Sequence, residues 1–303
     1  MADTHARLNL SAGIASVSVA LVLIGLKLWG LAMTGALSLA ASLVDNALDL
    51  LVSMGALVAI VYAARPADED HAFGHTSAED LAALFQSLVV IASAAVIASF
   101  AVLRLLDENP AGLQAEGVGI VVMVLSILLT GALVLWQRHV AHRTGNRVVA
   151  ADSLHYLSDL MPAIGTLVAL GVSAQWGIGQ VDSVVALAAA VWLAWNGGKI
   201  GLGAWHALMD RSAPPEVLER IGAVAGSWPG ARGWHDLRTR TAGSRLFISM
   251  HVEIDGQLSL NEAHAIADGL EHALRDAFPD AWVIIHTDPV GPGSGRESKA
   301  RLG

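Results

Sequence analysis

Six long apolar stretches fill the first two thirds of the chain and constrain its fold more than any other feature. A helix needs about 20 mostly apolar residues to cross a bilayer, and each stretch is at least that long. Small residues recur along all of them, as is common where helices pack closely in lipid. The stretches cover residues 10–33, 37–63, 81–106, 113–136, 148–172 and 184–205. The pattern predicts six transmembrane helices.

A large water-soluble helical protein is the alternative to a membrane bundle. The chain has 303 residues, of which 54% are hydrophobic and only 15% are charged. A soluble domain usually carries about 25% charged residues. Since one water-soluble core cannot hide so many apolar residues, composition favours a bilayer as the second solvent.

Composition also limits the partners and the metal ligands. The net charge is −9 and no basic stripe is present, which argues against a nucleic-acid partner. The chain has no cysteine, so disulfides and thiolate metal sites are excluded. With 12 histidines and 27 carboxylates, any metal site must use nitrogen and oxygen ligands.

Arginines gather in alternate connections between the apolar stretches. The connections around residue 34 and over 107–116 and 173–182 contain no Lys or Arg. Cytoplasmic loops are enriched in Lys and Arg, so we expect both termini in the cytoplasm and the bundle in the inner (plasma) membrane. The arginines assigned to the cytoplasmic side are Arg7, Arg65, Arg138, Arg143, Arg147 and Arg211.

The chain after Asp210 has the pattern of a soluble domain. Pro214 and Pro215 mark a boundary, and Ser259 with Glu262 forms a capping box that begins a helix. We expect helices over 216–225 and 259–278 and strands over 234–241, 245–255 and 282–287. The α-β-β-α-β order predicts a small α+β sandwich. The predicted domains are a transmembrane domain (1–210), a cytoplasmic metal-binding and dimerisation domain (211–290) and a disordered tail (291–303).

Acidic residues inside two apolar stretches are the strongest functional feature. Asp45 and Asp49 lie four residues apart in the second stretch, and His155 and Asp159 repeat that spacing in the fifth. An ionised carboxylate in lipid costs several kcal/mol, so such groups face a cavity or a partner. Two oxygens from one helix facing a nitrogen and an oxygen from another can build a tetrahedral site suited to Zn²⁺. A proton relay, or helix packing without a metal, remains the alternative.

A second candidate cluster lies in the loop at 65–78. His71 and His75 are four residues apart, and Asp68 precedes His71 by three. One helical turn could align all three on a single ion. A solvated acidic loop with incidental histidines explains the spacing equally well.

A third candidate cluster lies in the predicted cytoplasmic domain. His251 points away from the apolar face of its strand, and His286 and Asp288 share a strand face two residues apart. His235 and His264 could join them. Exposed histidines on a sheet are common, so spacing alone favours a surface without metal.

These segments together resemble the cation diffusion facilitator family, and most closely its bacterial YiiP-type zinc exporters. The resemblance runs from the first apolar stretch to Asp288. The segments that carry it are SLVDNALD at 42–49, DEDHAFGH at 68–75, HYLSD at 155–159, HDLRTR at 235–240 and IIHTDP at 284–289. Five segments in the right order are far more specific than a lone DxxxD pattern.

The resemblance implies a role for each cluster. It assigns Asp45, Asp49, His155 and Asp159 to the transport site, and Asp68, His71 and His75 to a loop site. It implies a ferredoxin-like cytoplasmic domain in which two ions tie the protomers of a homodimer together. The residues assigned to that site are His235, His251, His264, His286 and Asp288. The family exports divalent metal in exchange for protons by alternating access.

Ser77 departs from the family pattern. YiiP-type proteins have a lysine at this position, which forms a charge interlock with an aspartate that matches Asp210. Serine cannot form an ion pair, so the resemblance does not extend to the interlock.

We therefore expect a homodimeric antiporter, not an enzyme, that exports Zn²⁺ and binds zinc in its cytoplasmic domain as a structural or regulatory ion. Fe²⁺, Cd²⁺ and Mn²⁺ remain alternative substrates because an oxygen-rich site admits them. A membrane-anchored metal sensor or storage protein is the rival function. Acids buried at mid-membrane favour transport over that rival, since a sensor has no need of them. The absence of an HExxH motif and of a nucleophile–base pair disfavours a membrane hydrolase.

Overall fold

The computed structural model describes residues 2–34, 37–106, 117–176, 181–279 and 281–290. The chain divides into two compact units, one of which is Thr4–Trp205 and the other of which contains His206 and the residues that follow. The predicted disordered tail at 291–303 and the start of the predicted stretch at 113–136 lie outside the described residues.

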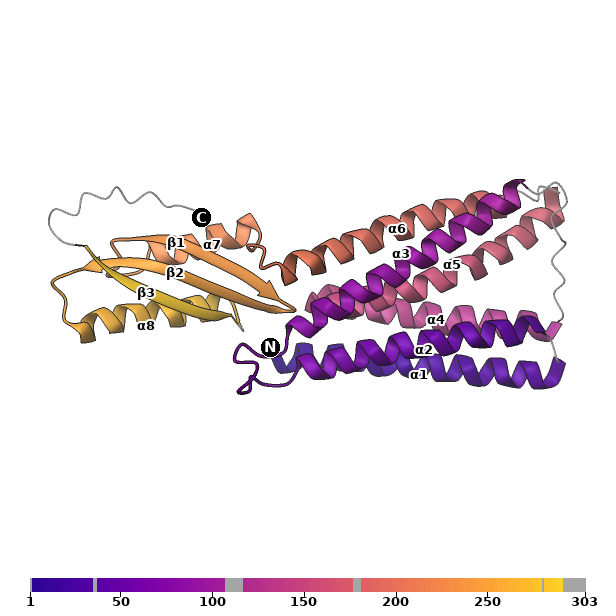
Figure 1. The fold of residues 1–303 in the computed structure, drawn as a ribbon, viewed down its shortest axis with the longest axis horizontal. Helices are drawn as coiled ribbons and strands as arrows, with labels where there is room; N and C mark the ends of the chain where they lie inside the picture. Colours follow the sequence, from indigo (N-terminus) through magenta and orange to yellow (C-terminus); the bar gives the residue numbers. More distant parts are fainter. Residues whose placement is uncertain (1, 35–36, 107–116, 177–180, 280, 291–303) are drawn as a thin grey trace. The chain divides into compact units, whose positions relative to one another are not determined.

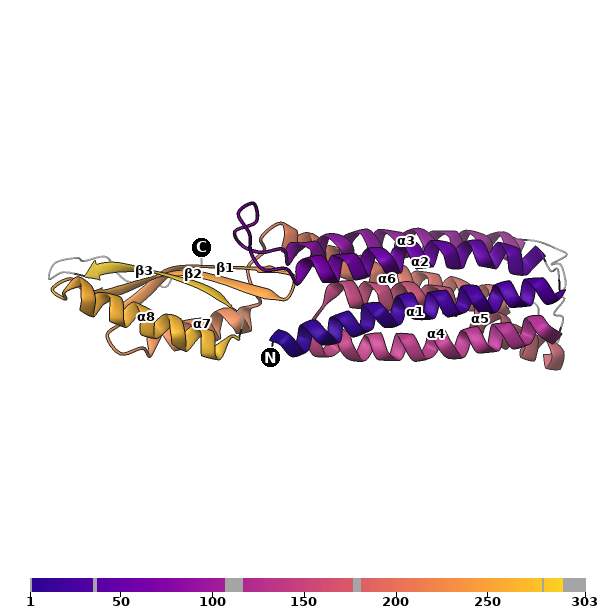
Figure 2. The same cartoon turned by 90° about the horizontal axis from the view of Figure 1, so that it is seen from below.

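Six long helices make up the first unit and run side by side along its length (Figures 1 and 2). Their positions confirm the six predicted helical stretches. They are α1 (Ala2–Thr34), α2 (Leu37–Ala63), α3 (Ser77–Leu106), α4 (Gly117–Thr144), α5 (Arg147–Trp176) and α6 (Val181–Leu208).

Four of these helices contain a described segment long and apolar enough to cross a membrane. The segments are Thr4–Ala32, Asn46–Ala63, Ser77–Leu103 and Val124–Thr144. Membrane crossing by α5 and α6 stays a prediction. The outer surface agrees with a lipid environment, because large apolar side chains such as Phe85, Phe100 and Leu135 are more than 60% exposed.

Several polar side chains are buried inside the helical bundle. Ser16, Ser53, Gln137 and Asp152 are all at most 2% exposed. Helix backbones also approach closely, since a Cβ added at Gly201 on α6 would lie 2.4 Å from the Ser87 hydroxyl oxygen on α3. Close packing and internal polar contacts are the forces that hold helices together in lipid.

The second unit contains the predicted α-β-β-α-β order. A three-stranded sheet has the strand order β1-β2-β3, with β1 antiparallel and β3 parallel to β2. Both helices lie on one face of this sheet (Figure 2). Three described strands do not establish the expected ferredoxin-like fold. The elements are α7 (Pro215–Gly226), β1 (Gly233–Ala242), β2 (Arg245–Asp255), α8 (Leu260–Ala277) and β3 (Trp282–Val290).

Strand β2 separates an apolar face from a polar one. Ile248, Met250 and Val252 are fully buried in the core under α7 and α8. Because strand side chains alternate, His251 lies on the opposite, open face, as the sequence predicted. The predicted capping box at the start of α8 is also confirmed.

Candidate metal centres

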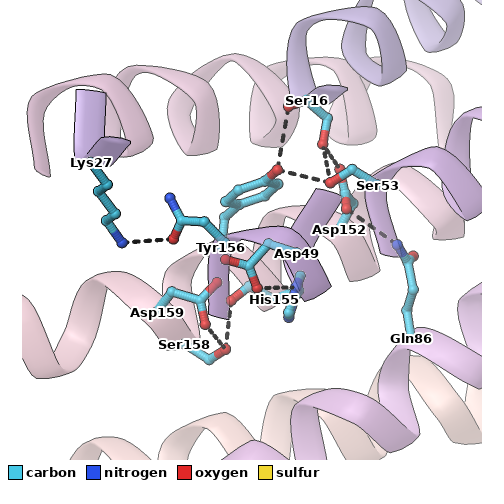
Figure 3. Close-up of polar contacts among 11 residues, drawn as sticks. Ser16, Lys27, Asp49, Ser53, Gln86, Asp152, His155, Tyr156, Ser158 and Asp159 are labelled. Atoms are coloured by element: carbon cyan, nitrogen blue, oxygen red, sulfur yellow. Dashed lines mark hydrogen bonds and ion pairs between the residues drawn. The ribbon is translucent and has the colours of Figure 1, made fainter. Parts of the chain in front are cut away.

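The first candidate centre lies inside the helical bundle, between α2 and α5. Ligand atoms of Asp49, His155 and Asp159 all lie within 4.8 Å of one another. His155 Nε2 is 3.4 Å from Asp49 Oδ1, and the three side chains converge in Figure 3. Asp45 belongs to α2, but its side chain lies outside the described residues. Three of the four predicted ligands therefore meet.

His155 has the surroundings expected of a metal ligand. It is only 4% exposed, and neither ring nitrogen has a hydrogen-bond partner among the described residues. Buried polar atoms are normally satisfied, and an unsatisfied one costs about 1–3 kcal/mol. A divalent cation held by the imidazole and the two carboxylates would remove that cost, so the residues fit a metal.

Two charged residues near this centre were not predicted from the sequence. Lys27 on α1 donates a hydrogen bond of 2.7 Å to Asn46 on α2 and interacts electrostatically with Asp159. Asp152 on α5 lies three residues before His155 and is 2% exposed. Both are charged residues inside apolar stretches, a signal that marks functional groups in membrane helices.

The second candidate centre is the loop cluster. Asp68 Oδ1 is 3.2 Å from His71 Nδ1, and Asp68 Oδ2 is 3.2 Å from His75 Nε2. The ring centroids of the two histidines are 4.5 Å apart, and Tyr62 lies edge-on to His75. His75 is 5% exposed and its Nδ1 lacks a partner among the described residues. All three predicted residues therefore converge, as a metal site requires.

Electrostatics favour the ionised form of Asp68. The backbone N–H of His71 donates a hydrogen bond of 2.7 Å to its carboxylate. This bond lowers the pKa of Asp68, and the hydrogen bond with the His71 side chain and the electrostatic interaction with both imidazoles lower it further. A carboxylate that stays ionised is the form that binds a cation.

The third candidate centre lies on the open face of the sheet. The parallel register pairs His251 with His286, and the antiparallel register pairs His251 with His235. Asp288 joins all three, at 2.9 Å from His251 Nδ1, 3.1 Å from His235 Nε2 and 3.3 Å from His286 Nε2. The hydrogen bond with His251 is the main reason why the pKa of Asp288 is lowered.

His264 is separated from these four residues. It lies exposed on α8, and α8 packs on the sheet face opposite the histidines. None of the convergent ligand groups among the described residues includes it. Within one protomer the structure does not bring it to the site.

Asp236 is a candidate ligand that the sequence did not reveal. It occupies the irregularity in register between His235 and Arg238 and has a positive φ of 48°. The ligand atoms of His235, Asp236 and His251 lie within 4.8 Å of one another. The alternation of a regular strand would point adjacent residues to opposite faces, so only the bulge brings Asp236 beside His235.

Comparison with known proteins covers both units. Residues 13–209 match the cation efflux transmembrane domain, and residues 213–290 match the cytoplasmic domain of cation efflux proteins. The cation-efflux pump FieF of Klebsiella pneumoniae is 40% identical over 289 residues, 95% of each chain. FieF of Pectobacterium atrosepticum is 43% identical over 288 residues, 94% of each chain. A solved CzrB chain is 41% identical and covers 26% of this chain and all of its own, with a TM-score of 0.25.

Proposed function

This chain belongs to the cation diffusion facilitator family of cation-efflux transporters, and on that premise we propose that it exports Zn²⁺ from the cytoplasm in exchange for protons. It is a transporter and not an enzyme. The proposal extends to the physiological metal, to the antiport mechanism and to a location in the inner membrane with both termini in the cytoplasm.

The convergence of Asp49, His155 and Asp159 inside the bundle is the observation that carries this proposal. Two carboxylates and a buried imidazole without a hydrogen-bond partner among the described residues supply oxygen and nitrogen ligands, the set that tetrahedral Zn²⁺ accepts. We assign Asp45 as the fourth ligand from its position four residues before Asp49 on α2. Fe²⁺, Cd²⁺ and Mn²⁺ remain alternative substrates, because affinity order alone does not exclude them.

The same residues give a physical route to antiport. Carboxylate and imidazole must be deprotonated to bind a metal, so protons and metal compete for the same atoms. A site that binds zinc on the cytoplasmic side and protons on the other side exchanges one for the other as access alternates. Each half of the cycle then prepares the site for the next ion.

We assign the other two centres to zinc that stays bound. The loop residues Asp68, His71 and His75 form one site, and His235, His251, His286 and Asp288 form the core of another. His264 is proposed to reach that second site from the other protomer of a homodimer, because the sheet of its own protomer separates it from the four. Zinc would then tie two cytoplasmic domains together.

Zinc flux into vesicles tests the proposed function. The purified protein is reconstituted in proteoliposomes that contain a zinc-sensitive dye, beside Asp159→Ala and an empty-vesicle control. We expect rapid zinc entry with the wild type and entry at the empty-vesicle rate with Asp159→Ala. Undiminished transport by Asp159→Ala would contradict the assigned site. Zinc binding without any flux in the wild type would favour a sensor or storage role.

A further inference from the structure

Asp152 is a buried acid that the transport site does not use. It lies three residues before His155 and seven before Asp159 on α5, so all three share one helix face. A rise of 1.5 Å per residue places it about 4.5 Å along the axis from His155. With 2% of its surface exposed, it sits on the side of the site nearer the start of α5.

Three other helices donate hydrogen bonds to this one carboxylate (Figure 3 shows those of Ser16 and Gln86). Ser16 on α1 donates to Oδ2 at 2.7 Å, Gln137 on α4 donates to Oδ2 at 2.6 Å, and Gln86 on α3 donates to Oδ1 at 3.2 Å. Both glutamine amides turn their nitrogens to the carboxylate and leave their own oxygens without a partner among the described residues. Neutral donors arranged in this way stabilise a buried negative charge.

A chain of hydroxyl groups leads away from Asp152. Ser16 Oγ lies 2.9 Å from Ser53 Oγ on α2, and Ser53 Oγ lies 2.8 Å from the Tyr156 hydroxyl. The Tyr156 hydroxyl also lies 3.3 Å from the Ser16 carbonyl oxygen. Tyr156 follows His155 directly, and their ring centroids are 5.8 Å apart. The chain therefore connects the neighbourhood of the transport site with Asp152.

The Ser16 hydroxyl has two acceptors in this chain. It has one hydrogen, which it can donate to Asp152 Oδ2 or to Ser53 Oγ, and with an ionised Asp152 it donates to Oδ2. With a protonated Asp152, Oδ2 donates to Ser16 instead, Ser16 donates to Ser53, Ser53 donates to the Tyr156 hydroxyl, and Tyr156 donates to the Ser16 carbonyl oxygen. The same positions satisfy both patterns without moving a heavy atom.

From these contacts we propose that Asp152 carries a proton that is exchanged for zinc, a role that rests on the proposed antiport. It is protonated when the transport site is empty and loses the proton when zinc binds. On reprotonation, a hydronium ion transfers a proton to Asp152 Oδ2 and leaves as water, and Ser16 turns its hydrogen from Oδ2 to Ser53 Oγ. One O–H bond forms on Asp152 Oδ2, and no electron is transferred.

Charges around Asp152 couple this proton to the metal. On its own helix, His155 and Tyr156 interact electrostatically with Asp152, and Asp49 on α2 interacts with both of them. The contacts from α1, α3 and α4 come from neutral groups. A divalent cation at His155 repels a proton on Asp152, and by linkage that proton weakens metal binding by the same factor.

The test is the number of protons released per zinc bound by the full-length protein. Isothermal titration in two buffers with different ionisation heats gives this number at each pH. We expect Asp152→Asn to bind zinc while its maximum proton release falls by about one. Zinc flux by the variant in proteoliposomes should respond less to an imposed pH gradient than flux by the wild type.

A matched variant separates proton transfer from the general loss of a buried acid. Asp80 on α3 is also fully buried and forms an ion pair with Arg147, so Asp80→Asn should keep the wild-type proton count. If Asp152→Asn does not fold, Ser16→Ala is the deciding variant, because it keeps the carboxylate and removes the hydroxyl that joins Asp152 to Ser53. Its zinc flux driven by a pH gradient should fall several-fold.

Two results would overturn the proposal. One is an unchanged proton count in folded Asp152→Asn, and the other is wild-type flux in Ser16→Ala where Asp152→Asn does not fold. Either result would leave the antiport itself intact if the wild type still releases protons on binding zinc. If the wild type releases none and ignores the pH gradient, the proposed antiport fails and this role of Asp152 fails with it.

Discussion

His155 is the one nitrogen ligand among the described residues of the proposed transport site. Its ring nitrogens have no hydrogen-bond partner among the described residues, so its orientation is not explained by local hydrogen bonding. Nitrogen and sulfur ligands favour the later divalent metals, whereas oxygen-only sites suit harder ions. We therefore expect the His at this position to determine metal preference.

Replacing this nitrogen with oxygen should change selectivity. We expect His155→Asp to transport Mn²⁺ at a rate closer to that of Zn²⁺, because the site then contains only oxygen ligands. The measurement is the ratio of initial rates for Zn²⁺, Cd²⁺ and Mn²⁺ in proteoliposomes. His142→Asp, on α4 outside the cluster, serves as control and should keep the wild-type ratio. Equal ratios in His155→Asp and wild type would show that His155 is not a ligand.

Sequence spacing predicted which residues converge between α2 and α5 better than it predicted their surroundings. The i,i+4 pair His155 and Asp159 was visible because two polar residues interrupt an apolar stretch. Asp152 carried the same signal, but its proposed role depends on Ser16, Gln86 and Gln137, which come from three other helices. Contacts between residues up to 136 positions apart depend on helix packing, and no local pattern encodes them.

At the scale of single elements, hydrophobic periodicity predicted the ends of some helices and strands better than those of others. The bounds of α2 and β2 agree with the prediction, whereas α4 continues to Thr144, eight residues beyond the predicted end. Apolar length measures only the part of a helix inside lipid, while backbone hydrogen bonding continues past it. The bulge at Asp236 was also beyond prediction, because it depends on the pairing of β1 with β2.

The capping box of α8 makes the cytoplasmic domain sensitive to acid. Glu262 accepts hydrogen bonds from the Ser259 hydroxyl and backbone N–H at 2.7 and 2.8 Å, which lower its pKa. Its stabilising effect is therefore complete above the unfolded pKa of about 4.5 and is lost as pH falls through the lower folded pKa. In Glu262→Gln, thermal stability should depend less on pH in this range.

Thermal melting of the cytoplasmic domain over a series of acidic pH values measures this effect. Glu219→Gln removes an exposed acid from α7 that caps no helix, and it should keep the wild-type pH dependence. The same pH dependence of thermal stability in Glu262→Gln and wild type would mean that the capping box does not contribute to the domain's sensitivity to acid.

The ligands on the open face of the sheet predict that two cytoplasmic domains associate more tightly when zinc is present. His251, His286 and Asp288 lie on the open face, where ligands from a second copy can complete the coordination of an ion. A fragment covering residues 213–290 should dimerise more tightly with Zn²⁺, because an ion bound only by the dimer stabilises it. Sedimentation would measure association with zinc and with excess chelator, beside His251→Ala. Equal association under both conditions would contradict a bridging role.

At the scale of the whole molecule, the link between membrane bundle and cytoplasmic domain departs from the family pattern. Ser77 begins α3, with Glu79 and Asp80 in its first turn, where serine suits a helix start. Asp210, the expected partner of the missing lysine, instead pairs with Arg240 at 3.1 Å. An exposed pair contributes only ~0–1 kcal/mol, although 1.4 kcal/mol changes a population tenfold. Zinc in the cytoplasmic domains would then be the main tie between protomers.

Introducing the family's lysine at position 77 tests whether the membrane bundles of two protomers lack a charge pair at their junction. Ser77→Lys should increase crosslinking between the membrane bundles of two protomers without metal, because Asp210 then gains a cationic partner. Adding Asp210→Ala to Ser77→Lys should cancel the gain. If crosslinking is the same in wild type and Ser77→Lys, another contact already closes the junction between the bundles.

Zinc movement against its own gradient, driven only by protons, tests the proposed antiport most directly. Proteoliposomes with equal zinc inside and outside receive a sudden pH gradient, acid inside, while zinc and pH are recorded together. We predict that zinc accumulates inside as protons leave, and that Asp49→Ala and a protonophore each abolish the accumulation. Zinc that never exceeds its outside concentration, whatever the pH gradient, would contradict proton-coupled export.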